Sequence, residues 1–217
     1  MILAIDGPSG SGKGTLTKAL AEHYNLALLD TGLLYRAVGW QLLNSNADID
    51  DPEAAIDVAT NLDLNVLNDP CLRSDEAAKI GSKIAVIPEV RQALNTLQRN
   101  FAYNTPKDKK GVILDGRDIG TVVCPDADYK LYLTASNEVR AMRRFKELQE
   151  RGIACIYSDV LKELIERDER DMSRKDSPLR PADDAFIIDT SDLSTEEVKI
   201  AAMRYIDTHK LKQVNDN

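Results

Sequence analysis

Five short apolar stretches recur along the chain, separated by longer stretches with helical periodicity. The apolar stretches span residues 2–5, 27–29, 112–114, 130–133 and 186–188. Their length and continuous hydrophobicity predict strands that are buried on both faces, and the amphipathic stretches between most of them predict covering helices. The pattern therefore predicts an α/β fold built on a five-stranded parallel sheet.

The amphipathic stretches indicate where the first helices lie. One helix is expected to begin at the stretch GPSGSGKGT and to run to about Tyr24, with Leu16 and Leu20 on the same stripe. A second helix is expected after DTG, with Thr31 as its N-cap. The inward-facing residues of this second helix are predicted to be Leu34, Val38 and Leu42.

The pattern changes between residues 45 and 110. Three stretches there have helical periodicity, DPEAAIDVATNL, RSDEAAKIGSKIAV and PEVRQALNTLQRNF, and one possible strand spans 62–67. The fifth predicted strand returns to the same core at 186–188. We therefore interpret 45–110 as a subdomain inserted into a single domain, 1–217, and not as an independent domain.

Composition narrows the class of protein. Hydrophobic residues make up 43% of the chain and charged residues 29%, which is typical of a globular protein. The net charge of −8 argues against a protein that binds nucleic acid through its overall field. The three widely spaced cysteines predict neither a disulfide framework nor a zinc site and favour the cytoplasm, and no apolar run approaches the length of a membrane span.

The stretch GPSGSGKGT carries the first candidate chemistry. It matches the phosphate-binding pattern G-x-x-x-x-G-K-[ST] at Gly7, Gly12 and Lys13, but the hydroxyl comes one position late, at Thr15. Glycines allow successive backbone N–H groups to face phosphate oxygens, and a helix N-terminus adds partial positive charge. A glycine-rich turn with a solvated lysine is the alternative interpretation.

The stretch GVILDGRDIGTVV delivers polar residues to the end of a predicted central strand. Asp115 is placed where a carboxylate can hold magnesium directly or through water, and Gly116 turns the chain so that Arg117 and Asp118 follow. Ordinary loop chemistry is the alternative, but two further charges at the end of a buried strand are costly without partners. In LLDTGLLYR, the stretch alone does not decide whether Thr31 and Arg36 serve a binding site. It is equally acceptable that Thr31 is only a helix cap and Arg36 only a solvated surface arginine.

An arginine-rich region spans residues 140–180. Arg167, Arg170, Asp171 and Arg174 follow helical spacing and are predicted to share one helix face, with Asp168 pointing elsewhere. Surface helices often carry such salt-bridged stripes, which is the alternative interpretation. Beside a phosphate-binding loop, the same guanidinium groups are suited to phosphoryl transfer, which requires several cations around the transferred group.

With these residues assembled, the sequence resembles the bacterial cytidylate kinases, within the superfamily of P-loop nucleoside monophosphate kinases. The resemblance spans nearly the whole chain and rests on GPSGSGKGT, DTGLLYR, DGRDIGTVVCPDA, RDERDMSR and PLRPADDAFIIDTS, in that order. It implies a three-layer fold in which 45–110 binds the nucleoside monophosphate and 140–175 forms a short lid with flanking arginine-rich helices. It also implies that G-K-G-T is the form of the loop in this superfamily and is not a damaged site.

The resemblance implies roles for individual residues. The ATP-binding residues would be Gly7, Pro8, Ser9, Gly10, Ser11, Gly12, Lys13, Gly14 and Thr15. The CMP-binding residues would be Thr31, Arg36, Ser82, Arg91, Arg117, Asp118, Arg167 and Asp171. The residues at the reacting phosphates would be Lys13, Arg117, Arg167 and Arg174, and the lid candidates would be Arg140, Arg143, Arg144 and Arg170. Magnesium would accompany ATP, with Asp115 holding it through water.

The chemistry of cytosine fits three of these residues. Asp118 can accept from the amino group of cytosine, whereas Arg91 and Ser82 can donate to its ring acceptors. The expected activity is ATP- and magnesium-dependent phosphorylation of CMP and dCMP by a monomeric enzyme without a nucleic-acid or membrane partner. A kinase for UMP, AMP or another small molecule, a nucleotide-dependent binding protein and a nucleic-acid-binding protein are the alternatives.

Overall fold

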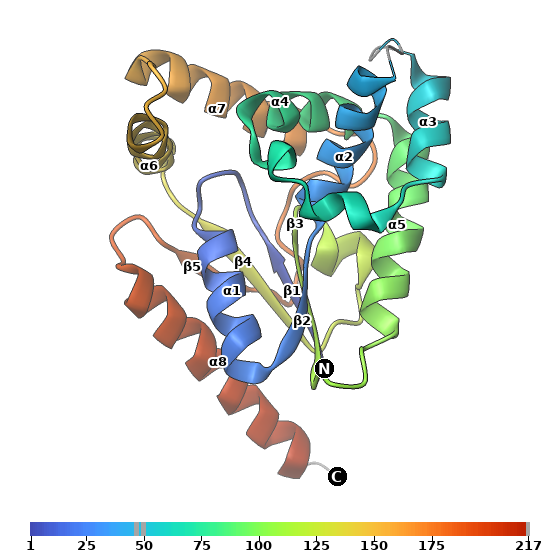
Figure 1. Ribbon diagram of the computed structural model, residues 1–217. Helices are drawn as coiled ribbons and strands as arrows, with labels where there is room; N and C mark the ends of the chain where they lie inside the picture. The colour runs from blue at the N-terminus through green and yellow to red at the C-terminus, as the bar shows by residue number, and fades with distance from the viewer. Residues whose placement is uncertain (46–47, 49–50, 216–217) are drawn as a thin grey trace. The chain divides into compact units, whose positions relative to one another are not determined.

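The computed structural model describes residues 1–45, 48 and 51–215 (Figure 1). Five strands form one parallel sheet in the order β2-β3-β1-β4-β5. Each predicted apolar stretch lies within one strand, so the α/β prediction is confirmed. The strands are β1 (Ile2–Asp6), β2 (Leu26–Asp30), β3 (Gly111–Gly116), β4 (Tyr129–Thr134) and β5 (Phe186–Asp189).

Helices account for most of the rest of the described chain. The α-helices are α1 (Lys13–Tyr24), α2 (Thr31–Asn44), α3 (Pro52–Thr60), α4 (Asp75–Ile84), α5 (Pro88–Tyr103), α6 (Asn137–Glu150), α7 (Tyr157–Met172) and α8 (Thr195–Asn215). Two short 3₁₀ helices, η1 (Leu64–Asn68) and η2 (Pro70–Arg73), precede α4, and a π-helical turn, η3 (Ile119–Val123), follows β3. None of the described helices is long and apolar enough to cross a membrane.

The contacts divide the chain into two compact units. The first unit combines Met1–Leu28 with Thr105–Asn217, and the second is Leu29–Asn104. The first unit contains the phosphate-binding loop, the arginine-rich helices and most of the sheet. The second unit contains the helices α2 to α5. Each unit has buried hydrophobic residues of its own.

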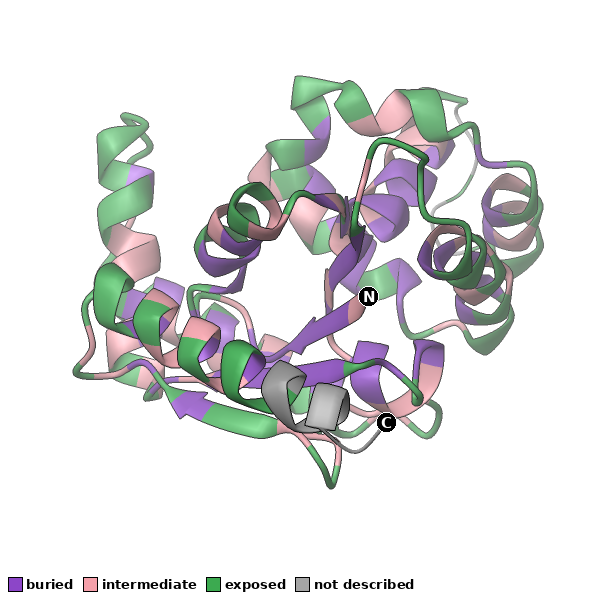
Figure 2. Ribbon diagram, turned by 90° about the horizontal axis from the view of Figure 1, so that it is seen from below, coloured by how far each residue is buried: buried purple, intermediate pink, exposed green. Residues whose placement is uncertain are grey.

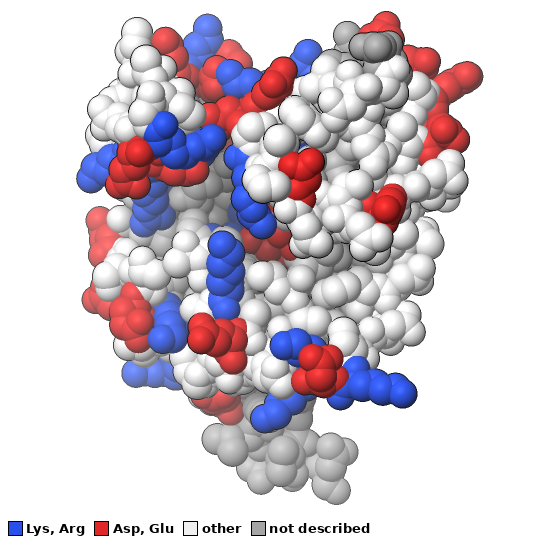
Figure 3. Space-filling model, in the orientation of Figure 1, with Lys and Arg blue, Asp and Glu red and all other residues white. Residues whose placement is uncertain are grey.

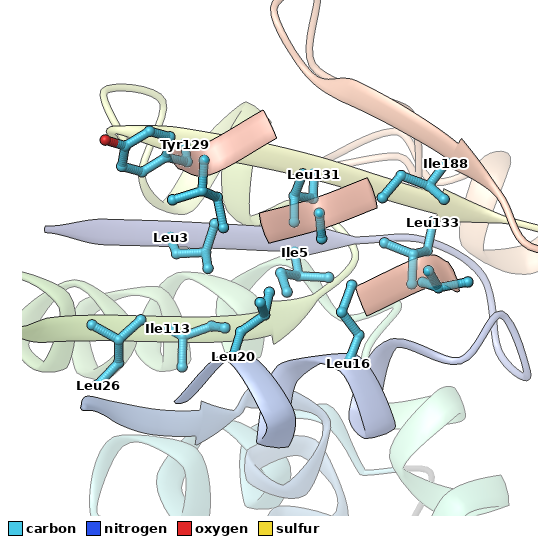
Figure 4. Close-up of a cluster of buried hydrophobic side chains, with 13 residues drawn as sticks. Leu3, Ile5, Leu16, Leu20, Leu26, Ile113, Tyr129, Leu131, Leu133 and Ile188 are labelled. Carbon is cyan, nitrogen blue, oxygen red and sulfur yellow. The ribbon is translucent and has the colours of Figure 1, made fainter. Parts of the chain in front are cut away.

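The core of the first unit lies between the sheet and the helices α1 and α8. Leu3 and Ile5 of β1 pack with Leu16 and Leu20 of α1, as Figure 4 shows. From α8 the residues Val198, Ala202 and Ile206, spaced four apart, enter the same cluster. Figure 2 shows that the central strands are buried along most of their length. This core fixes the carboxyl ends of the strands relative to α1.

The second unit is built on the packing of α2 against α4. Leu34, Val38 and Leu42 of α2 are fully buried, as the pattern predicted. Gly39 allows the two helices to approach closely, because a Cβ at this position would lie 2.2 Å from Cγ2 of Ile80. Helices α3 and α5 also pack against each other and against α2.

Two local predictions were wrong. The N-cap of α2 is Asp30, whose carboxylate accepts from Gly32 N at 3.1 Å, and Thr31 is instead the first, buried residue of the helix. Residues 62–67 do not form a strand. The side chain of Asp63 accepts from Asn65 N at 2.9 Å and stabilises the 3₁₀ helix η1 in place of an extended chain.

Candidate active site

The glycine-rich loop joins β1 to α1 at the carboxyl edge of the sheet. Gly10 and Gly12 have φ angles of 76° and 93°, which only glycine adopts readily. Gly7 approaches β4 so closely that a Cβ there would lie 2.0 Å from the carbonyl oxygen of Leu133. The loop leads directly into the N-terminus of α1, which begins at Lys13. This strand–loop–helix arrangement is the one that binds phosphate groups.

Lys13 is buried beneath the loop and donates from Nζ to the carbonyl oxygen of Pro8 at 2.8 Å. Burial, together with the charge of Arg117, lowers the pKa of Lys13 to about 7. Arg167 acts on Lys13 in the same direction, and Asp115 opposes both. The lysine therefore loses hydration among two arginines and two carboxylates, Asp115 and Asp6, and an incoming polyphosphate would favour its charged form.

Asp115 lies at the end of β3, opposite Ile5 of β1. Its carboxylate lies 3.8 Å from the position that a Cβ on Gly14 would take. Within the described part of the chain, no group of three His, Cys, Asp or Glu side chains could hold a metal ion by itself. A single carboxylate beside a phosphate-binding loop fits a magnesium ion that is held mainly by nucleotide phosphates and water.

Three arginines surround one buried carboxylate in the first unit. Arg117 donates from Nε to Asp171 Oδ2 at 3.0 Å, Arg167 lies 4.0 Å from the same oxygen, and Arg174 binds Oδ1. Burial alone would raise the pKa of Asp171, but the charges of Arg117, Arg174 and Arg167 outweigh it and hold this pKa below its ordinary value. Asp171 thus stays ionised and holds the three arginines together.

Asp118 follows Arg117 and is buried at the start of η3. The backbone at this point is held by Asp6, whose two carboxylate oxygens accept from Ile119 N and Gly120 N at 2.8 Å each. Burial raises the pKa of Asp6 to about 7. The side chain that ends β1 therefore fixes the loop that carries Arg117 and Asp118.

In the second unit, the predicted residues of α2 and α4 lie side by side. Arg36 is half-buried and donates from Nη1 to the carbonyl oxygen of Leu72 at 3.1 Å. A Cβ on Gly81 would lie 3.0 Å from Cγ of Arg36, so α4 approaches this arginine at the residue before Ser82. Ser82 is 6% exposed, and its hydroxyl has no hydrogen-bond partner among the described residues. A buried hydroxyl of this kind is available to a ligand.

Arg91 of α5 joins the same group of residues. It is 3% exposed, donates from Nη1 to the carbonyl oxygen of Ala85 at 3.4 Å and lies 5.4 Å over the ring of Tyr35. A guanidinium over an aromatic face is held in a fixed orientation. Tyr35 and Arg36 are adjacent on α2. Through its contact with Tyr35, Arg91 is therefore tied to the helix that carries Arg36, another predicted CMP-binding residue.

The lid candidates lie in different surroundings. Arg140 and Arg143 donate to backbone oxygens of the glycine-rich loop, and Arg144 pairs with Glu147 at 2.6 Å. Arg170 is exposed on α7. Figure 3 shows basic and acidic side chains intermixed over α6 and α7, which agrees with the salt-bridged character of these helices.

Two details of the predicted arginine stripe were wrong. Asp168 does not point away from the site, because it is 6% exposed and accepts from Arg140 at 2.6 Å. Arg174 lies beyond the end of α7 at Met172 and reaches Asp171 from the following segment. The buried face of α7 is formed instead by Leu164, Asp168 and Asp171, in addition to Val160.

Sequence reasoning missed three polar residues of this region. Asp6, Asp168 and Thr190 all make buried hydrogen bonds with functional segments. Asp6 carried a usable signal, because a carboxylate at the end of an apolar strand needs a partner. Asp168 and Thr190 carried none, because each lies among other polar residues and nothing in the local sequence marks it as the one that is buried.

Comparisons with known proteins extend over the whole of this region. A sequence model of the family described as cytidylate kinase matches residues 3–208. A protein described as cytidylate kinase from Brucella suis biovar 1 is 51% identical over 212 residues, covering 98% of this chain and 94% of that protein. A protein of the same description from Brucella melitensis biotype 1 is 50% identical with the same coverage.

Among solved structures, an uncharacterized protein from Eubacterium ventriosum ATCC 27560 matches with a TM-score of 0.57. It is 16% identical in sequence, and the match covers 95% of this chain and 98% of that one. At this identity the likeness concerns the fold alone. The sequence comparisons, by contrast, include the segments that carry the loop, the arginine cluster and the residues of α4 and α5.

Proposed function

The chain belongs to the cytidylate kinase family, and we propose that it transfers the γ-phosphoryl group of ATP to CMP and dCMP. The products are ADP and the cytidine diphosphate. The observation that carries the proposal is the electrostatic surrounding of Lys13, whose pKa is lowered by Arg117 and Arg167 after burial. Lys13 of the glycine-rich loop and two of the arginines that surround Asp171 thus act on one another within one unit.

The proposed reaction is a direct, in-line displacement. An anionic phosphate oxygen of CMP attacks the γ-phosphorus of ATP, a new O–P bond forms, and the bond to the β-phosphate oxygen breaks with its electron pair leaving on ADP. No general base is needed, because the attacking oxygen is already ionised at neutral pH. Catalysis then comes from positioning and from positive charge around the transferred group.

Individual residues have separate tasks in this proposal. The loop and Lys13 bind the phosphates of ATP, and Arg117, Arg167 and Arg174 stabilise charge on the transferred group. Asp171 keeps these arginines oriented. When bound, magnesium would neutralise charge on the nucleotide phosphates, with Asp115 holding it through water.

The proposal also gives individual residues tasks in recognition of the acceptor. Arg36 is expected to bind the phosphate of CMP, with Thr31 beside it on α2. The buried hydroxyl of Ser82 and the oriented guanidinium of Arg91 supply donors for the ring acceptors of cytosine. Asp118 supplies an acceptor for the amino group, which UMP lacks.

A direct assay tests the proposal. ADP production from ATP and magnesium is compared with CMP, dCMP, UMP and AMP as acceptors at equal concentrations. High rates with CMP and dCMP, a low rate with UMP and little ADP without acceptor are expected. A higher rate with UMP or AMP would keep the kinase and reject the assigned pyrimidine specificity. Release of ADP that does not depend on an acceptor would reject the kinase.

Asp118→Ala tests the assignment of base recognition. Loss of the carboxylate removes the group that distinguishes an amino donor from a carbonyl, a difference worth about 1–3 kcal/mol. The ratio of kcat/KM for CMP to that for UMP should fall by about tenfold or more. Asp183→Ala, which changes a fully exposed aspartate of the same unit, is the matched control and should leave the ratio unchanged. An unaltered ratio in Asp118→Ala would contradict the assignment.

A further inference from the structure

The backbone of the glycine-rich loop is held by side chains. Four consecutive carbonyl oxygens each accept one side-chain hydrogen bond: Pro8 O from Lys13 Nζ (2.8 Å), Ser9 O from Arg140 Nη1 (3.0 Å), Gly10 O from Arg143 Nη1 (3.4 Å) and Ser11 O from Thr190 Oγ1 (3.1 Å). Because the C=O and N–H of one peptide point in opposite directions, a carbonyl that is held by a side chain also fixes the direction of the N–H that would bind a phosphate.

We propose that Arg140, Arg143 and Thr190 are positioning residues that fix the loop backbone for ATP, with Asp168 orienting Arg140. The inference rests on the proposed function, because it assumes that the loop binds the phosphates of ATP. It gives the first two arginines a task different from that of a lid that closes over the nucleotide.

The hydrogen bonds of Arg140 support this assignment. Its guanidinium donates to the carbonyl oxygens of Ala135 and Ser9 and to the side chains of Asn137 and Asp168, at 3.0, 3.0, 2.5 and 2.6 Å. Four of its five N–H groups are therefore used within the protein. The side chain is also 2% exposed. Arg140 thus has one N–H group left and little capacity for a nucleotide.

Helix α6 also packs directly against the loop at Gly10. A Cβ on Gly10 would lie 3.1 Å from Cβ of Arg140 and 3.2 Å from its carbonyl oxygen. Arg143, one turn further along α6, also donates from Nη1 and Nη2 to the hydroxyl and carbonyl oxygen of Thr190, at 2.9 and 2.6 Å. The loop is therefore supported by α6 and by the residue that follows β5.

Stability alone is a poor explanation for the pair of Arg140 and Asp168. A buried ion pair gains little over well-packed apolar residues, because both charges lose their hydration. Here the second oxygen, Asp168 Oδ1, is buried without a hydrogen-bond partner among the described residues. Asp168 also lies one turn before Asp171, which holds the arginine cluster. Helix α7 thus supports the glycine-rich loop through Asp168, which binds Arg140. It supports the arginine cluster through Asp171.

Four variants separate positioning from mere structural support. Arg140→Lys keeps the charge but cannot form the fork that spans several acceptors. Arg140→Met combined with Asp168→Leu replaces the buried pair by apolar groups, which restores packing without restoring the bond to the loop. Thr190→Val removes one hydroxyl while it leaves the ion pair intact. Arg151→Ala, at the exposed end of α6, is the matched control.

Three measurements are made on each variant. Calorimetric titration with magnesium-ADP in the absence of acceptor gives the affinity of the loop, and steady-state rates give the KM values for ATP and CMP. Thermal unfolding reports stability independently. In Arg140→Lys and in the double variant, the Kd for ADP and the KM for ATP should rise about tenfold or more. The KM for CMP should change less than about twofold, because its assigned residues are untouched.

The double variant decides between the two explanations. The proposal expects it to unfold near the temperature of the parent and yet to bind ADP weakly. Thr190→Val should bind ADP weakly as well, although by a smaller factor. Parental ADP affinity in the double variant, or in both Arg140→Lys and Thr190→Val, would overturn the proposal. A parent that binds ADP without phosphorylating CMP would instead reject the proposed function, and the loop could still be tested.

Discussion

At the scale of single residues, Lys13 couples nucleotide binding to protonation. Burial and the neighbouring Arg117 lower the pKa of Lys13 to about 7 in the free chain, and the phosphates of ATP favour its charged form. Binding at pH 8 should therefore take up almost one proton, and binding at pH 6 should take up about 0.1 proton. Calorimetric titration in buffers of different ionisation enthalpy measures this uptake.

Lys13→Arg is the control for this prediction. Arginine stays charged in the free and the bound protein, so the uptake at pH 8 should disappear even if the affinity changes. Equal uptake in the parent and in this variant would assign the proton to another group. The comparison is informative because Asp6 also titrates near neutrality and remains present in both proteins.

The predictability of the site differs from residue to residue for a physical reason. The positions of Lys13 and Asp118 could be predicted, because each stands at a fixed offset from a local pattern of glycines at the end of a strand. The inward position of Asp168 could not, because Asp168 and Arg170 lie on opposite sides of α7 and the arginine spacing placed the side of Arg170 inward. Only the buried Arg140, on another helix, decides which of the two turns inward.

At the scale of elements, the close approach of α2 and α4 depends on Gly39. Glycine to alanine in a helix ordinarily stabilises by up to about 1 kcal/mol. Here the added Cβ would lie 2.2 Å from Cγ2 of Ile80, which is too close for the two helices to keep their spacing. Gly39→Ala should therefore destabilise the chain by about 1–2 kcal/mol in urea unfolding. It should also raise the KM for CMP, because Ser82 lies on α4.

A second substitution tests the stated cause. Ile80→Ala removes the atom that collides, so Gly39→Ala added to Ile80→Ala should cost little or nothing further. Additive losses of stability in the double variant would mean that the collision is not the source of the effect. Unchanged stability in Gly39→Ala alone would mean that α2 and α4 separate without loss of packing.

Strands and long helices were predictable because their patterns are local. The stretch 112–114 is apolar enough to predict β3, and the periodicity of Leu34 and Val38 predicts α2. The stretch 62–67 also contains apolar residues, yet capping by Asp63 and Asp69 converts the segment to short 3₁₀ helices. The sequence alone hardly shows whether such a segment forms a strand or a capped 3₁₀ helix. Either structure gives the backbone N–H groups hydrogen-bond partners.

At the scale of the whole molecule, two buried groups set how stability depends on pH. The pKa of Asp6 is raised from 3.8 to about 7, mainly by burial, so between these values the folded chain binds more protons than the unfolded chain. The free energy of unfolding then falls as pH rises toward 7. The pKa of Lys13 is lowered from 10.5 to about 7, so above pH 7 the unfolded chain binds more protons and the free energy of unfolding rises.

Together these groups predict a minimum in stability near pH 7 for the chain without nucleotide. Asp171 acts elsewhere, because its lowered pKa affects stability only below about pH 4. Urea unfolding from pH 5 to pH 9 should show a loss of about 2 kcal/mol between pH 5 and pH 7 and a gain above pH 7. Asp6→Asn should flatten the acidic limb and leave the alkaline limb in place. If stability still falls from pH 5 to pH 7 in Asp6→Asn, the titration belongs to a different buried carboxylate. If the stability of the parent changes in one direction only between pH 5 and pH 9, the assignment of Lys13 is contradicted as well.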